Sequence, residues 1–313
     1  MSDPVNSPLK TTTELTFNMF SDSQKMKPFY DRYLELFDSK KEIDWAVDEA
    51  QLLVADILLE RIEGVHPNGD RQIDQSDESD LLLRSILDGW AMRRSQGEPL
   101  QYIFGHWPFF ELDLICDSRA LIPRPETEGL VELVISDCRR NGSNQLRVLD
   151  LGAGTGAIGL SIAASKVASS VVLVDFSEAA CALTLENLTR NSGKIACLVE
   201  VIQSDWFEKL SNRSFDVIVS NPPYIRSAEI ASLQVELAME PRSALDGGED
   251  GLDPYRKIIS SAKEYLNDGG VVYFEIGFDQ GDDLIAIGKS SGFGKIEVIK
   301  DFAAHDRYVK MSI

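Results

Sequence analysis

Cysteine and histidine are scarce in this 313-residue sequence, and their spacing argues against several kinds of site. The four cysteines and three histidines stand at Cys116, Cys138, Cys181, Cys197, His66, His106 and His305. No Cys-x-x-Cys pair occurs, and the histidines lie far apart, so neither set has the spacing of metal ligands. We therefore expect no bound metal and no disulfide framework.

Long apolar segments and targeting signals are also absent. No run of about 18 apolar residues could form a membrane helix. The first residues, MSDPVNSPLKTTTELTF, lack the charged stretch and following apolar stretch of a signal peptide. We expect a cytoplasmic protein without a membrane partner.

Basic residues are few relative to acidic ones. The sequence has 31 Lys and Arg against 51 Asp and Glu, which gives a formal charge of −20. The excess is spread along the chain, with −8 up to Gly97 and −12 beyond it. Because nucleic acids and anionic membranes bind clustered Lys and Arg, this composition argues against nucleic acid as the main ligand.

The first part of the chain has the apolar spacing of helices. Residues 29–37, 43–62 and 81–95 carry apolar side chains at helical intervals. The polar, turn-rich stretch GVHPNGDRQIDQSDESD (64–80) separates the last two and is predicted to be a loop. These segments predict a small all-α bundle.

From about Gly97, short apolar strands alternate with helices. Strands are predicted at 147–152, 171–176, 196–203, 215–220 and 271–277, and helices at 157–166, 178–191 and 254–266. Residues 294–313 are predicted to form two more strands joined by a tight reversal. This alternation indicates an α/β fold with a parallel sheet covered on both faces. Ligands of such sheets bind beyond the carboxyl ends of the strands.

The first of these strands runs directly into the glycine-rich stretch DLGAGTGAIG (150–159). Gly152, Gly154 and Gly156 allow a sharp turn and close approach to a ligand, and the next helix offers its N-terminal N–H groups. Because Gly154, Gly156 and Gly159 also form a G-x-G-x-x-G pattern, the loop alone does not separate a dinucleotide site from an S-adenosylmethionine site.

Asp175 ends the second strand, where a carboxylate can accept hydrogen bonds from both ribose hydroxyls of either cofactor. The alternative is a helix N-cap ahead of Glu178, a role that Ser177 could equally fill. Together with the glycine loop, Asp175 favours a nucleoside cofactor and leaves its identity open.

QSDWF (203–207) follows the third strand and suits an adenine ring. Asp205 can accept a hydrogen bond from the exocyclic amine, and Trp206 can stack on the ring or wall it. A tryptophan after a strand is more often part of the core, so this pair is a weak signal by itself.

SNPPYI (220–225) follows the fourth strand, and Asn-Pro is also an ordinary way to end a strand. Pro222 and Pro223 have no backbone N–H, so their carbonyl groups face a ligand without a neighbouring donor. With the amide oxygen of Asn221 they can accept both hydrogens of a planar NH₂ group, on which Tyr224 can pack. This arrangement favours a nitrogen methyltransferase over a dehydrogenase.

In combination, these motifs resemble the HemK/PrmC-type peptide chain release factor N5-glutamine methyltransferases. The stretches that carry the resemblance are GEPLQYIFG (97–105), LIPRPETE (121–128), VLDLGAGTGAIG, VDFS, SDWF, SNPPYI, EPRSALDGGEDGLD (240–253) and FEIGFDQG (274–281). The resemblance covers roughly residues 43–313 and implies a Rossmann-like, seven-stranded class I methyltransferase sheet, mostly parallel with the last strand antiparallel. It implies a helical partner-recognition domain at 1–96, a hinge and β-hairpin at 97–120, and a catalytic domain at 121–313.

The resemblance also implies the reaction. The side-chain nitrogen of the glutamine in the Gly-Gly-Gln motif of class I release factors would receive a methyl group from S-adenosylmethionine, leaving S-adenosylhomocysteine and modulating translation termination. The cofactor would contact Gly152, Ala153, Gly154, Thr155, Gly156, Asp175, Asp205, Trp206 and Asn221. The substrate amide would contact Asn221, Pro222, Pro223, Tyr224 and Phe109, with Arg124, Glu126 and Glu128 at the rim. We expect a monomer with a release factor as its partner.

Three alternatives remain. DNA adenine N6-methyltransferases share the Asn-Pro-Pro-Tyr loop, but the charge of −20 and the lack of a basic cluster argue against them. A ribosomal-protein glutamine methyltransferase fits PRPETE less well. A non-catalytic partner of the translation apparatus would not need an intact Asn221, Pro222 and Tyr224.

DGGEDGLDPYRK (246–257) superficially resembles a calcium loop, through Asp246, Asp250 and Gly251. Its twelfth position is Lys257, where a bidentate Glu is required, and its third is Gly248. We interpret the stretch as a flexible loop near the pocket.

Overall fold

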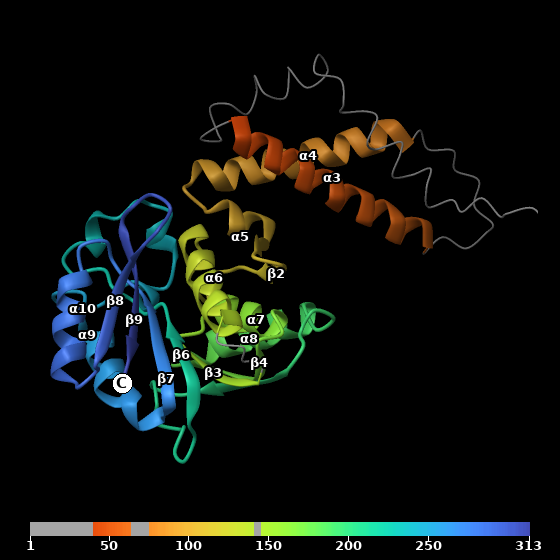
Figure 1. Ribbon diagram of the computed structural model, residues 1–313. Helices are drawn as coiled ribbons and strands as arrows, with labels where there is room; N and C mark the ends of the chain where they lie inside the picture. The colour runs from red at the N-terminus through yellow and green to blue at the C-terminus, as the bar shows by residue number, and fades with distance from the viewer. Residues whose placement is uncertain (1–39, 64–74, 141–144) are drawn as a thin grey trace, which may run out of the picture. The chain divides into compact units, whose positions relative to one another are not determined.

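The computed structural model describes residues 40–63, 75–140 and 145–313, which form two compact units that divide between Phe104 and Gly105 (Figure 1). The helix predicted over 29–37 lies outside the described residues, as does most of the predicted loop over 64–80.

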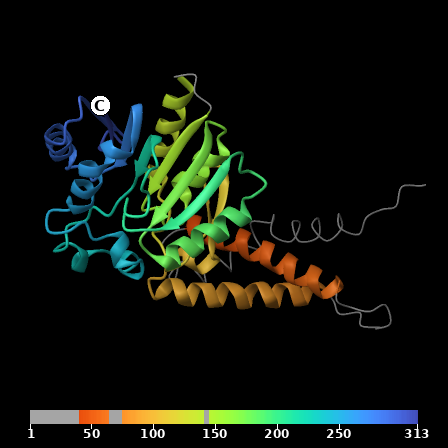
Figure 2. The same cartoon turned by 90° about the horizontal axis from the view of Figure 1, so that it is seen from below.

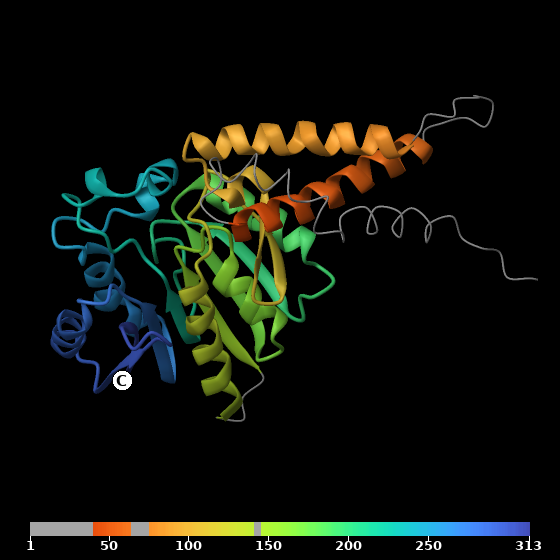
Figure 3. The ribbon, with the colours of Figure 1, turned by 90° about the horizontal axis from the view of Figure 1, so that it is seen from above.

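The N-terminal unit contains two long helices, α3 (Lys40–Glu63) and α4 (Gln75–Ser95), which lie side by side and are followed by the short helix α5 (Leu100–Phe104) (Figure 3). Its core contains Ile43 and Val47 of α3, Leu87 of α4, and Leu100 and Ile103 of α5. The helices predicted over 43–62 and 81–95 are confirmed.

The prediction of a loop up to residue 80 was wrong from position 75 onward, where α4 begins. The sequence there, QSDESD, has no apolar periodicity and therefore gives no helix signal. Acidic residues are nevertheless favourable near a helix N-terminus, because they interact with the positive end of the helix dipole. Asp77 and Glu78 occupy such positions in the sequence of α4.

The second unit is built on a seven-stranded sheet with the order β5-β4-β3-β6-β7-β9-β8. The strands are β3 (Leu146–Leu151), β4 (Ala168–Asp175), β5 (Leu198–Gln203), β6 (Phe215–Ser220), β7 (Leu266–Glu275), β8 (Lys295–Lys300) and β9 (Asp306–Ser312). The last strand, β9, pairs antiparallel with β7 and β8, and the pairs from β5 to β7 are parallel. The predicted fold class is confirmed. Figure 2 shows the green strands side by side.

Helices cover both faces of this sheet (Figure 1). One face packs against α6 (Pro125–Arg140), α7 (Ala157–Ala164) and α8 (Glu178–Arg190), and the other against α9 (Asp253–Ala262) and α10 (Gly281–Ser290). Alternate residues of a strand face opposite sides, so Val148 of β3 lies in one core and Leu149 in the other. Burial on both faces explains why these strands are continuously apolar in the sequence.

Strand β7 begins five residues before the predicted start at Val271. Its early part, LNDG, has the residue types of a turn in the sequence. In the structure, Gly269 has a φ of 77° there. The pairing with β6 shifts register between Phe215 and Val217, so the chain passes through an irregularity and stays in the sheet.

A hairpin of β1 (His106–Phe109) and β2 (Leu112–Ile115) packs against α8. Asn187 of α8 accepts a hydrogen bond from the backbone N–H of Ile115 at 2.6 Å and donates to its carbonyl at 3.2 Å. Asn191, one turn later, bonds in the same way to both backbone groups of Asp113, at 3.1 and 2.8 Å. Asn187 also donates to the carbonyl of Thr155 at 2.9 Å, which joins the hairpin to the glycine loop.

Candidate active site

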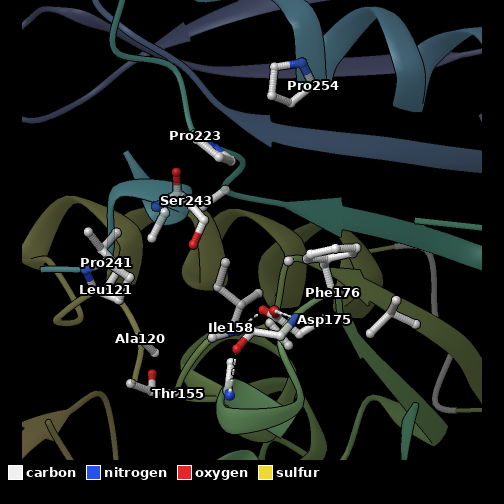
Figure 4. Close-up of a pocket in the computed structure, with 18 of the residues that line it drawn as sticks. Ala120, Leu121, Thr155, Ile158, Asp175, Phe176, Pro223, Pro241, Ser243 and Pro254 are labelled. Carbon is white, nitrogen blue, oxygen red and sulfur yellow. Dashed lines mark hydrogen bonds between the residues drawn. The ribbon is translucent and has the colours of Figure 1, made fainter. Parts of the chain in front are cut away.

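One cavity of about 390 Å³ lies where the loops after β3, β4, β5 and β6 meet. The strand order reverses between β3 and β6, which is where open α/β sheets bind their ligands. Figure 4 shows Leu121, Pro241 and Ser243 on one side of the cavity and Asp175 and Phe176 on the other. The predicted site residues that line it are Arg124, Gly152, Ala153, Gly154, Thr155, Asp175, Asp205, Trp206, Asn221 and Pro223.

The glycine loop approaches the cavity with its backbone. Gly152, Gly154 and Gly156 have φ values of 73°, 57° and 84°, in the left-handed region that favours glycine. Gly152 and Gly154 line the cavity. Gly156 does not line it and is packed from behind, where an added Cβ would come within 2.8 Å of Leu160. The structure therefore places Gly156 as the N-cap of α7.

Asp175 ends β4 in the wall of the cavity, and both of its carboxylate oxygens accept backbone hydrogen bonds (Figure 4). One accepts from the N–H of Gly154 and the other from the N–H of Ser177, each at 2.9 Å. Burial raises the pKa of Asp175 above its usual value, and these hydrogen bonds oppose the rise. Ser177 supplies the N-cap of α8, so the alternative role for Asp175 is filled by its neighbour. A carboxylate has about four lone-pair sites, so Asp175 retains acceptor capacity for a ligand hydroxyl.

Asp205 and Trp206 line the same cavity after β5. Trp206 lies in the left-handed region with a φ of 47°, which is uncommon for a bulky residue and costs backbone strain. Its ring lies 3.7 Å from the position that a Cβ on Gly152 would occupy. The indole therefore packs beside the glycine loop, a placement that the weak sequence signal left open.

Asn221 and Pro223 line the cavity, whereas the other predicted substrate contacts do not. Pro222 is buried, and Tyr224 is half-buried against the core beside α9, where burial raises its pKa to about 12. Phe109 is only 2% exposed and belongs to the core between the hairpin and α6. The structure thus joins Asn221 to the glycine loop and leaves the two aromatic rings outside the cavity lining.

The backbone after Asn221 is held by the segment over 245–251, part of the stretch that was expected to be a flexible loop near the pocket. Ile225 donates to the carbonyl of Leu245 at 3.0 Å and accepts from the N–H of Gly247 at 2.8 Å. The buried side chain of Gln280 donates to the carbonyls of Tyr224 and Gly251, at 3.2 and 3.1 Å. This segment is therefore a hydrogen-bonded support for the Asn-Pro-Pro-Tyr loop.

The carboxylates of that segment have protein partners. Asp246 pairs with Arg242 at 2.9 Å and accepts from the N–H of Gly248 at 3.1 Å, and Asp250 pairs with Arg256. Over residues 40–63, 75–140 and 145–313, no group of three or more His, Cys, Asp or Glu side chains could hold a metal ion. Over those same ranges, no helix is long and apolar enough to cross a membrane.

Two arginines at the cavity are neutralised by neighbouring carboxylates. Arg124 forms an ion pair with the buried Glu240, which also accepts from the N–H of Ile122 at 2.8 Å. Arg119 pairs with Asp117 and Glu186, each at 2.7 Å. These pairs fasten the PRPETE segment and the segment before it to distant parts of the unit. Of the three predicted rim residues, Arg124 lines the cavity, and Glu128 accepts from the N–H of Phe110 at 2.8 Å.

Two buried carboxyl groups beside the cavity were missed at the sequence level. Asp150 is fully buried at the end of β3, and one of its oxygens accepts from the N–H of Gly159 at 2.8 Å. Its other oxygen has no hydrogen-bond partner, and burial raises the pKa of Asp150 to about 7. Glu275 is 1% exposed at the end of β7, and burial raises its pKa to about 7. In the sequence, both look like ordinary strand residues.

Comparisons with known proteins place the catalytic unit in a class. The family model described as Methyltransferase small domain matches residues 131–250. The hMettl16 catalytic domain superposes with a TM-score of 0.50 at 15% identity, covering 65% of this chain and 76% of that one, a likeness that extends to the fold alone. The fold, the cavity and the family model together define a methyltransferase.

Curated relatives show to which family of methyltransferases the chain belongs. The relative from Agrobacterium fabrum is 40% identical over 264 residues, covering 83% of this chain and 88% of its own length. The relative from Geobacter sulfurreducens is 35% identical over 289 residues, covering 88% and 96%, and that from Salmonella typhimurium is 36% identical over 254 residues, covering 81% and 89%. All three carry the name release factor glutamine methyltransferase. The chain belongs to this family.

Proposed function

We propose that this protein transfers the methyl group of S-adenosylmethionine to the side-chain nitrogen of the glutamine in the Gly-Gly-Gln motif of class I peptide chain release factors. The observation that carries the proposal is the position of Asn221, which lines the same cavity as Asp175 and the glycine loop, in a chain of this family. A nucleoside cofactor and a primary amide can therefore meet in one cavity.

The residues around the cavity fit the cofactor. Backbone groups of Gly152 and Gly154 would hold its methionine part, and the remaining acceptor capacity of Asp175 would take its ribose hydroxyls. Asp205 and Trp206 line the cavity and would contact the adenine side. When bound, the cofactor supplies an electrophilic methyl group and leaves as S-adenosylhomocysteine. A cavity of about 390 Å³ lies within the usual range for a ligand of this size.

The chain's own contribution to the chemistry is positioning. An amide nitrogen is a poor nucleophile because its lone pair is delocalised into the carbonyl group. The side-chain oxygen of Asn221, which lines the cavity, would accept one of its hydrogens, and the family resemblance implies the carbonyl of Pro222 as the acceptor of the other. Holding both hydrogens fixes the group and increases electron density on the nitrogen. The proton leaves after methyl transfer, when the nitrogen has become acidic. No covalent intermediate is needed.

The protein partner is a release factor, recognised in part by the helical unit that ends at Phe104. We extend the proposal to a cytoplasmic monomer that modulates translation termination by this modification. The family resemblance supports this assignment, and the acidic chain, with a formal charge of −20, suits a basic protein surface better than a nucleic acid.

A labelled-methyl assay tests the proposal. The wild-type protein is incubated with methyl-labelled S-adenosylmethionine and, in separate reactions, a class I release factor, the same factor without the motif glutamine, ribosomal proteins and duplex DNA. Label should enter only the intact release factor. Label in DNA or in a ribosomal protein would instead favour one of the alternative substrates, and label in none of them would favour a non-catalytic partner.

Asn221→Ala is the matching variant. We expect its turnover to fall by at least about a hundredfold, as for loss of a preorganised polar contact to a reacting group. Calorimetric titration should show nearly unchanged cofactor affinity, because the glycine loop and Asp175 are intact. A variant that methylates at the wild-type rate would contradict the role of Asn221.

A further inference from the structure

Three side chains from three different elements form a hydrogen-bonded series that ends at Asn221. Thr127 lies in the first turn of α6 and is 4% exposed, and Glu275 ends β7 and is 1% exposed. The hydroxyl of Thr127 donates to a carboxylate oxygen of Glu275 at 2.7 Å and accepts from the amide nitrogen of Asn221 at 3.2 Å. Thr127 and Asn221 line the cavity, and Glu275 is shielded from it.

The series has a direction because a hydroxyl group has a single hydrogen to donate. Glu275, when ionised, has only acceptors, so the hydrogen of Thr127 is committed to it. Toward Asn221, the Thr127 oxygen can therefore only accept, which requires the NH₂ end of the amide. The reversed amide would place its oxygen against an oxygen without a hydrogen to share, and would leave a buried hydroxyl poorly satisfied.

We propose that Thr127 and Glu275 are positioning residues that fix which end of the Asn221 amide faces the cavity. With its nitrogen held by Thr127, the Asn221 oxygen is left to accept a hydrogen of the substrate's NH₂ group. This role rests on the proposed function and adds to it that the Asn221 amide is prevented from rotating by 180°, which would exchange its oxygen and its nitrogen. An amide free to flip would present a donor to the substrate amine for part of the time, and the substrate would be repelled.

The strand end that carries the carboxylate is fixed, because the backbone carbonyl of Glu275 accepts from the hydroxyl of Tyr255 at 2.7 Å. Burial raises the pKa of Glu275, and the hydrogen bond from Thr127 and the charge of Arg307 oppose the rise. Because the pKa lies at about 7, the test belongs at pH 8, where the carboxylate is ionised.

The test compares Thr127→Val, which replaces the hydroxyl by a methyl group of similar size, with Thr127→Ser, which keeps it. The measurements are kcat and KM for a class I release factor, cofactor affinity by calorimetry, and the melting temperature. We expect Thr127→Val to lower kcat by about tenfold or more, as for a misplaced reacting group, while cofactor affinity stays within about twofold. Thr127→Ser should restore most of kcat.

Two further variants complete the design. Thr189→Val makes the same exchange on the exposed face of α8, where the hydroxyl donates to the carbonyl of Leu185 at 2.9 Å, and should leave kcat unchanged. Glu275→Gln can offer either a donor or an acceptor to Thr127, so the hydroxyl is no longer committed and kcat should fall severalfold. This variant decides the matter if Thr127→Val does not fold.

The outcomes separate this inference from the function on which it rests. An inactive wild-type protein would overturn both. An active wild type with a Thr127→Val or Glu275→Gln variant of equal kcat would overturn the positioning role alone. A Thr127→Ser variant as impaired as Thr127→Val would do the same, because keeping the hydroxyl would then not preserve kcat.

Discussion

Replacing Gly251 by alanine should disturb the Asn-Pro-Pro-Tyr loop without touching the cavity lining. Gly251 has a φ of 79°, and a Cβ added to it would lie 2.4 Å from the carbonyl oxygen of Tyr224. The same Cβ would lie 2.9 Å from the side-chain nitrogen of Gln280, which donates to that carbonyl. The substitution therefore disrupts the hydrogen bond between Gln280 and the carbonyl of Tyr224, which holds the loop in place.

The size of the effect has two separable parts. An alanine in the left-handed region costs about 1–2 kcal/mol of folding free energy. Ordinary contacts to a Cβ begin near 3.4 Å, so the Tyr224 oxygen at 2.4 Å must move by about 1 Å, the difference of the two. Tyr224 is two residues from Pro222, and a displacement of about 1 Å at a positioning group costs on the order of a hundredfold in rate.

Gly269 provides a matched control. Its φ is 77°, and an added Cβ there would meet nothing within 4 Å. Gly269→Ala therefore carries the backbone strain of Gly251→Ala without the displacement. We expect urea unfolding to show a loss of about 1–2 kcal/mol for Gly269→Ala, and a larger loss for Gly251→Ala because the backbone carbonyl of Tyr224 must also shift. Methyl transfer should fall about a hundredfold only in Gly251→Ala, with near wild-type cofactor affinity in both.

The reasoning fails if folded Gly251→Ala and Gly269→Ala have equal kcat, since the support behind the loop would then have no influence on the amide contacts. It also fails if Gly251→Ala loses cofactor affinity and kcat in proportion, because the displacement would then have reached the glycine loop.

Two further predictions concern carboxylates beside the cavity. Asp175→Ala should weaken cofactor binding more than tenfold in a calorimetric titration, because it removes the ribose acceptor and the partner of the Gly154 N–H; unchanged affinity would refute that role. Asp150 has a pKa raised from 3.8 to about 7 in the folded protein, so folding takes up a proton between these values. The stability of the wild type relative to Asp150→Asn should therefore decrease as pH rises from about 4 to 7, by at most about 1.4 kcal/mol per pH unit, and parallel urea-unfolding profiles of the two proteins would contradict this.

The features that could be predicted from the sequence are those with local signals. Strand β6 matches its predicted bounds, 215–220, because FDVIVS is apolar throughout and Asn221-Pro222 ends it. The glycine loop could likewise be located, because its turn requires residues that tolerate a positive φ. The carboxyl-end rule then placed the loops after four strands in one region.

The supporting residues could not be predicted, because each acts through a partner distant in the sequence. Thr127 and Glu275 bond across 148 positions, and Gln280 reaches Tyr224 across 56. Their residue types are common at helix starts and strand ends, so neither composition nor periodicity marks them. Gly251 stands in a family motif and in a calcium-loop pattern, but neither shows that its φ and its contact with Tyr224 are what require a glycine.

The hairpin of β1 and β2 has a consequence for how the sequence can vary. Asn187 and Asn191 hold it through the backbone N–H and carbonyl groups of Ile115 and Asp113, and these groups are present whatever side chains the hairpin carries. Such an attachment tolerates substitution on the attached strand, while the two asparagines themselves are hard to replace. The hairpin can therefore acquire new surface chemistry, in nature or by engineering, while Asn187 keeps it fastened to the carbonyl of Thr155.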